Sequence, residues 1–143
     1  MIAQVILLLL LRPHADPIQE PAIRSMCWSL LGKARFGFAR EEQAAFVVRG
    51  DDGRFSLVEW PSNGLADCAG WQGALPRGAV GIVHTHPNWL PMPSRIDVQT
   101  ASRVRMPVYV ITRERITRTD GSDAHVVLEG EWSRITTEGP RDS

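Results

Sequence analysis

The sequence has 143 residues, of which 43% are hydrophobic and 22% are charged. This length and composition are ordinary for one globular domain with a buried core. Sixteen basic residues balance sixteen acidic ones, which argues against a protein that binds nucleic acid or a membrane surface by neutralising phosphate groups. We therefore expect neither a nucleic-acid partner nor a membrane partner.

The two cysteines, Cys27 and Cys68, lie far apart in the sequence, and no CxxC pair is present. This spacing excludes a cysteine-rich zinc site. We interpret both residues as reduced thiols of a cytoplasmic protein. A disulfide between them stays open as an alternative.

Residues 2–11 are almost wholly apolar. Ten residues are too few to cross a bilayer, and the only early charge, Arg12, follows the run instead of preceding it as in a signal peptide. We predict a buried strand or a short core helix here, with a signal sequence as the lesser alternative. The expected domain spans residues 1–136, followed by a frayed polar tail at 137–143.

The first half of the domain shows one helix and one hairpin. Apolar residues at helical spacing predict an amphipathic helix over residues 21–35, with a proline in its first turn. Strands are predicted over residues 43–49 and 54–60, joined by the turn residues 50–53. Residues 61–78 are rich in glycine and proline and predict a loop.

The second half begins with a short apolar run, which predicts a buried strand over residues 79–83. A proline-rich loop follows, and Ser94 is a natural N-cap for a helix predicted over residues 95–105. Further strand segments are predicted over residues 107–112, with 115–119 as their extension, and over 125–132. This order predicts an α/β domain with a mixed β-sheet flanked by helices.

His84 and His86 stand at the end of the predicted strand 79–83. In an extended chain residues i and i+2 point to the same side, and imidazole nitrogen is a good zinc ligand. Asp97 can be folded back as a third ligand, which would leave one position open for water, as in catalytic zinc sites. The alternatives are a His-x-His pair without function and an Asp97 that only caps the helix.

The spacing of these residues resembles the signature of the JAB1/MPN/Mov34 (JAMM) metalloprotease family, His-Ser/Thr-His-Pro-x6-Ser-x2-Asp. The sequence reads His84-Thr85-His86-Pro87, then six residues, Ser94, two residues and Asp97. So many residue types at fixed offsets are hard to match by chance. The resemblance implies a prokaryotic-type JAB domain with the MPN/JAB-like fold, which is similar to that of cytidine deaminases.

The resemblance also implies a role for each motif residue. His84, His86 and Asp97 would bind Zn²⁺, and Ser94 would donate a hydrogen bond to the developing oxyanion. Pro87 would shape the turn that aims His86. Thr85 points to the opposite face of the strand, and we interpret it as structural.

Family members also carry a glutamate near the start of a strand that follows the first helix. Glu42 fits this position and would act as the general base, accepting a proton from water and passing it to the leaving amine. The Cys-Gly that usually follows is replaced by Ala44-Ala45, so Glu41 remains an alternative and Glu20 a distant third. Asn63 matches an asparagine that is often seen after the second strand of the family.

The resemblance implies a zinc-dependent peptidase or isopeptidase that cleaves at the C-terminus of a ubiquitin-like or sulfur-carrier protein. Trp89, between the ligands, is a candidate substrate contact. The main alternative is a catalytically silent MPN-type scaffold or binding domain in a protein complex. A RadC-like domain linked to DNA repair is a third idea, which the zero net charge does not support. The oligomeric state is open.

Overall fold

The computed structural model describes residues 16–61, 71 and 73–134. The predicted element at residues 2–11 and the predicted tail lie outside the described residues. Asn63 and Cys68 also lie outside them.

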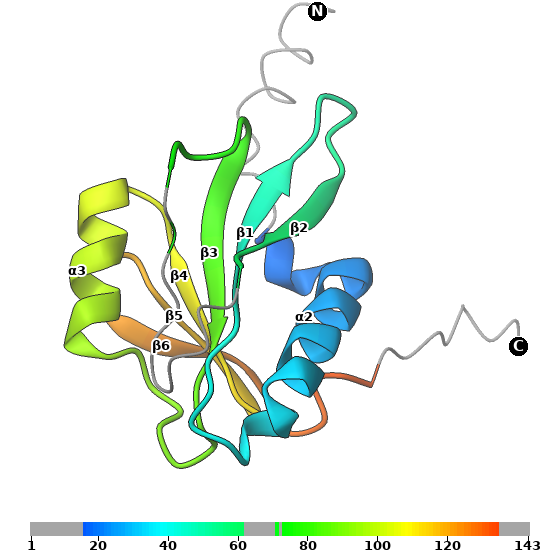
Figure 1. Ribbon diagram of the computed structural model, residues 1–143, viewed down its shortest axis with the longest axis vertical. Helices are drawn as coiled ribbons and strands as arrows, with labels where there is room; N and C mark the ends of the chain where they lie inside the picture. The colour runs from blue at the N-terminus through cyan, green and yellow to red at the C-terminus, as the bar shows by residue number, and fades with distance from the viewer. Residues whose placement is uncertain (1–15, 62–70, 72, 135–143) are drawn as a thin grey trace, which may run out of the picture.

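Six strands form one mixed sheet in the order β2-β1-β3-β4-β5-β6 (Figure 1). Strands β3 and β4 are parallel, and every other neighbouring pair is antiparallel. The parallel pair requires a crossover connection, which contains the helix α3. The strands are β1 (Ala44–Arg49), β2 (Phe55–Glu59), β3 (Ala79–Thr85), β4 (Val108–Ile111), β5 (Arg115–Thr119) and β6 (Ala124–Glu129).

One helix covers each face of the sheet (Figure 1). The helix α2 (Pro21–Lys33) lies between two short 3₁₀ turns, η1 (Pro17–Gln19) and η2 (Arg35–Gly37), and α3 (Arg95–Val104) lies on the opposite side. The larger core cluster joins apolar residues of α2 to one face of the central strands, and the smaller one joins α3 to the other. Strand residues alternate between the two clusters because successive side chains point to opposite faces.

Alternation along β3 and its neighbours therefore fixes which residues face α3. Val83 belongs to the cluster under α2, whereas Ile82 belongs to the cluster under α3. In β1, Ala45 packs toward α2 and Phe46 toward α3. By the same parity the side chain of His84 extends toward α3, on the face opposite the large core.

The predicted α/β class with a mixed sheet and flanking helices is confirmed, and the elements differ from expectation mainly at their ends. Helix α2 is two residues shorter than predicted, because residues 35–37 turn into the left-handed region. Residues 115–119 are not an extension of the preceding strand, because the chain reverses at a turn that Thr112 N–H closes on the Arg115 carbonyl. The last strand ends at Glu129, and Trp132 beyond it packs edge-on against Trp28 in the core.

None of the described helices is long and apolar enough to cross a membrane.

Candidate metal centre

The predicted histidines lie where the parallel pair of strands ends. His84 is the last but one residue of β3, opposite Val110 of β4. His86 continues the same pairing, because its backbone N–H donates to the Ile111 carbonyl at 3.0 Å. Strand geometry is thus maintained through both residues, and it places the two imidazoles on one side with their centroids 4.6 Å apart.

Glu42, two residues before β1, reaches the same place because β1 runs antiparallel to β3 and begins where β3 ends. Thr85 fixes this entry: its hydroxyl oxygen accepts from Gln43 N–H at 2.9 Å, and its own N–H donates to the Gln43 carbonyl at 2.8 Å. Thr85 is fully buried on the α2 face, as its predicted structural role requires. Its two bonds determine where the backbone beside Glu42 lies.

Asp97 is brought to the histidines by the start of α3. Ser94 is the N-cap, and the two residues form a capping box: Ser94 Oγ accepts from Asp97 N–H at 3.2 Å, and Asp97 Oδ2 accepts from Ser94 N–H at 2.6 Å. The capping role considered for Asp97 is therefore real. Its carboxylate also faces the imidazoles, so capping and metal binding do not exclude each other.

These side chains line one pocket of about 380 Å³ between the sheet and α3. Asp97 Oδ1 lies 2.8 Å from His84 Nε2, and Asp97 Oδ2 lies 3.4 Å from His86 Nε2. Glu42 Oε2 approaches the other nitrogen of His84, Nδ1, at 3.6 Å. None of these four side chains is more than 14% exposed, so their charges interact with little screening by water.

The donor set fits a metal ion. Among the described residues, Glu42, His84 and His86 offer three ligand atoms within 4.8 Å of one another and could hold a metal. Asp97 is outside that set, although it lies closer to His84 Nε2 than Glu42 lies to His84 Nδ1. Two ligand sets are therefore possible, with either carboxylate beside the two imidazoles.

His84 Nε2 supplies an independent indication. It is buried and makes no hydrogen bond to any described residue, although Asp97 Oδ1 is only 2.8 Å away. A buried polar atom without a hydrogen bond is costly and needs an explanation. A cation shared by the nitrogen and the carboxylate would satisfy both atoms.

The electrostatics of the pocket also favour a cation. Burial lowers the pKa of His84, but the carboxylates of Asp97 and then Glu42 outweigh it and raise the pKa to about 9. Burial raises the pKa of Asp97, whereas its contacts with His84 and His86 hold that pKa well below its usual range. At neutral pH the site thus keeps a positive charge between its carboxylates, and a metal ion would replace that proton.

His86 is oriented by its second nitrogen. Nδ1 lies 2.8 Å from the Leu90 carbonyl, an acceptor that requires the proton on Nδ1 and so leaves the lone pair on Nε2 for a ligand. The carbonyl is held in place by a turn in which Leu90 N–H donates to the Pro87 carbonyl at 2.9 Å. This is the turn that Pro87 was predicted to shape.

The sequence matches the family described as prokaryotic homologs of the JAB domain over residues 22–126. The chain belongs to this family. The match runs from α2 into β6 and includes Glu42 and the motif from His84 to Asp97, so the predicted family is confirmed. No curated protein matches the chain.

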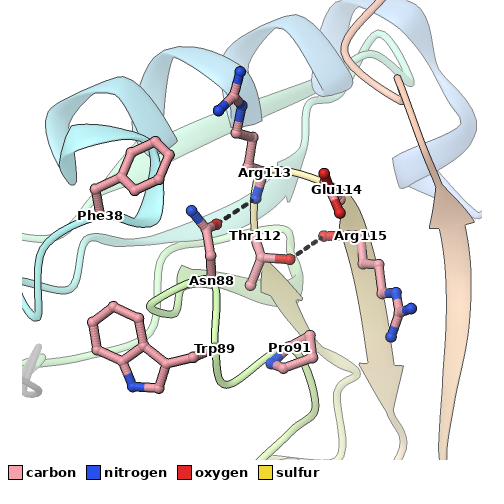
Figure 2. A pocket seen from close by; sticks show the side chains of 8 residues that line it. All are labelled: Phe38, Asn88, Trp89, Pro91, Thr112, Arg113, Glu114 and Arg115. Atoms are coloured by element: carbon pink, nitrogen blue, oxygen red, sulfur yellow. Dashed lines mark hydrogen bonds between the residues drawn. The ribbon is translucent and has the colours of Figure 1, made fainter.

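The structure separates the candidate glutamates of this JAB domain. Glu42 lines the pocket, whereas Glu41 does not. Glu20 lies at the N-terminal end of α2. Trp89 does not line the metal pocket: it is 59% exposed and borders a second, larger pocket of about 510 Å³ beside Phe38 (Figure 2).

Three residues of the site, Leu90, Trp60 and Ala44, were not predicted from the sequence. Leu90 acts through its carbonyl, which carries no signal in the residue type. Trp60 and Ala44 line the candidate metal pocket, and Trp60 N–H donates to the Ala44 carbonyl at 2.8 Å. The alternating pattern indicates the hairpin but leaves its register open.

Proposed function

We propose that the chain is a zinc-dependent peptidase or isopeptidase that cleaves at the C-terminus of a ubiquitin-like or sulfur-carrier protein. The observation that carries the proposal is the convergence of two imidazoles and two carboxylates, all largely buried, on one pocket. His84 Nε2 makes no hydrogen bond to any described residue there, although Asp97 Oδ1 is 2.8 Å away. Membership of the prokaryotic JAB family supports the proposal that the chain is a hydrolase.

In this proposal His84, His86 and Asp97 hold the zinc ion. When bound, zinc lowers the pKa of a water molecule and polarises the substrate carbonyl. Glu42 is then the general base: its carboxylate accepts a proton from water and later donates it to the amine that leaves. Asp97 and Glu42 approach different nitrogens of His84, at 2.8 and 3.6 Å, so the two carboxylates occupy separate places in the pocket.

Ser94 suits the role of oxyanion donor. Its oxygen already accepts the Asp97 N–H, so the hydroxyl proton is free to be donated. Because the same bond fixes the oxygen at the helix start, the donor is oriented before substrate arrives, which is the condition for effective stabilisation.

Exposed apolar side chains beside the site support a polypeptide substrate. Leu90 and Ile96 line the metal pocket and are 54% and 72% exposed. Trp89, the proposed substrate contact, precedes Leu90 in the chain and lines the second pocket. Exposed apolar residues that gather at one place on a surface commonly mark a protein-binding site.

The test combines metal analysis with a cleavage assay. Purified protein is measured for zinc per chain, and then incubated with ubiquitin-like and sulfur-carrier proteins that carry a C-terminal fusion. We expect near-stoichiometric zinc, its loss in His86→Ala, and cleavage that is abolished in Glu42→Gln with zinc retained. Loss of zinc in Glu42→Gln would instead make Glu42 a ligand.

The scaffold alternative predicts a different result. A wild-type protein that binds zinc and cleaves none of the fusions, under conditions in which an active relative cleaves them, would favour a silent MPN-type domain. A wild-type protein that binds no zinc after reconstitution would refute the proposed enzyme.

A further inference from the structure

Asn88 joins three segments that are far apart in the sequence. Its backbone N–H donates to the Gly37 carbonyl and its side-chain NH₂ donates to the Phe36 carbonyl, both at 2.9 Å. Its side-chain oxygen accepts from the backbone N–H of Arg113 at 2.9 Å, a bond that Figure 2 shows. One residue thereby ties the loop after β3 to the end of α2 and to the turn between β4 and β5.

The segment at the end of α2 depends on these bonds. Arg35 and Phe36 have φ values of 52° and 54°, which residues with a side chain adopt only at a cost. Gly37 follows at φ 79°, and a Cβ atom there would lie 2.2 Å from the Asn88 side-chain oxygen. The side chain of Asn88 thus occupies the space that a glycine leaves, and its bonds hold the left-handed run in place.

Two short stretches of chain connect the hydrogen bonds of Asn88 to the proposed metal centre. Asn88 is the second residue of the turn that ends at Leu90, and the Leu90 carbonyl is the acceptor that orients His86. On the other side, the chain runs only five residues from Gly37 to Glu42. Asn88 therefore holds in place both the loop that follows His86, a proposed ligand, and the chain that leads to Glu42, the proposed base.

We propose that Asn88 is a positioning residue of the metal centre, which holds the His86 imidazole and the chain leading to Glu42 in register with each other. This inference rests on the proposed zinc site. Groups that orient metal ligands without touching the metal typically change metal affinity or activity by about tenfold to a hundredfold when they are removed. We expect a loss of that size in zinc affinity, although Asn88 contacts none of the ligands through its side chain.

The experiment measures zinc affinity by competition with a chromophoric chelator under native conditions. Asn88→Ala removes both side-chain bonds and should weaken zinc binding by about tenfold to a hundredfold. Asn88→Asp is close in size and keeps an acceptor for Arg113 N–H, but it replaces the donor to the Phe36 carbonyl with an acceptor oxygen that repels that carbonyl, so a loss of similar size is expected. The matched control is Arg113→Ala, which deletes the guanidinium, leaves the backbone N–H, and should bind zinc like the wild type.

Hydrogen exchange of the metal-free protein provides a second readout. In Asn88→Ala the amides of residues 35–38, 86–90 and 112–114 should exchange faster together, because all three segments lose the same anchor. In Asn88→Asp only the first two segments should do so. If the alanine variant does not fold, the aspartate variant carries the test alone.

The outcomes separate this inference from the proposed function. Wild-type zinc affinity in both Asn88 variants, with faster exchange in the three segments, would make Asn88 a structural residue only and overturn the inference. A loss of affinity equal to that of Arg113→Ala would overturn it as well. A wild-type protein without zinc affinity would refute the proposed function and this inference with it.

Discussion

Replacing Asp97 with Asn separates the two roles of its carboxylate. The amide oxygen can still accept from Ser94 N–H, the 2.6 Å bond of the capping box, so the start of α3 should survive. The negative charge beside the two imidazoles disappears. A structural zinc site contributes about 10 to 16 kcal/mol over four ligands, or about 2.5 to 4 kcal/mol each. Loss of one ligand should therefore weaken zinc binding about 60- to 700-fold.

Two controls accompany the Asp97→Asn variant. Ser94→Ala removes the N-cap side chain and should lower the free energy of unfolding by about 1 kcal/mol, with the zinc ligands left intact. Urea unfolding of each variant with a chelator measures the capping effect, and competition with a chromophoric chelator measures zinc affinity. If Asp97→Asn binds zinc within about threefold of the wild type, Asp97 is only a helix cap and Glu42 must be the carboxylate ligand.

Two further predictions concern the core. Burial raises the pKa of the Cys27 thiol to about 12 from 9.0. The unfolded chain therefore loses this proton first as the pH rises, and stability is lost above pH 9. Between about pH 7 and pH 10 the free energy of unfolding should fall by about 1.4 kcal/mol more in the wild type than in Cys27→Ala. Equal losses in the two proteins would contradict the raised pKa of Cys27. Tyr109→Phe deletes a buried hydroxyl that donates to Asp16 at 2.6 Å and accepts from Arg118 at 3.1 Å. Its free energy of unfolding should fall by about 1 to 3 kcal/mol in urea, and an unchanged value would show that the Tyr109 hydroxyl contributes nothing to stability.

Much of the fold could be predicted because the local signals agree with the tertiary structure. The apolar stripe of α2 faces the larger core cluster, and the alternating residues of β1 and β2 form the predicted hairpin. Helix α3 begins at the predicted cap, Ser94. In these segments periodicity and end signals point to the same element, and tertiary contacts do not override them.

The errors occur where long-range contacts decide. The end of α2 turns left-handed at Arg35 and Phe36, neither of which is a glycine, and the bonds that hold this turn come from a residue more than fifty positions later. The sequence also placed Trp132 in the last strand. It lies beyond that strand because its indole N–H donates to the Thr112 carbonyl at 3.0 Å and its ring packs on Trp28.

The residues of the candidate site could be predicted from the spacing of one motif, His84 to Asp97, whereas the residues that support them could not. Histidines two apart at a strand end must share a side, so their proximity could be predicted from backbone geometry. Leu90 acts through its backbone carbonyl, and Asn88 acts through hydrogen bonds to turns that are distant in the sequence. No residue type marks such roles, and only the folded chain reveals them.

The capping box at the start of α3 has an evolutionary consequence. Ser94 and Asp97 begin a helix whether or not a metal is present, so selection for folding alone would preserve them in a lineage that no longer needs catalysis. Glu42 has no comparable bond to the backbone among the described residues. In descendants that drift toward a scaffold, Glu42 should therefore be replaced first, while the serine and aspartate of the motif persist.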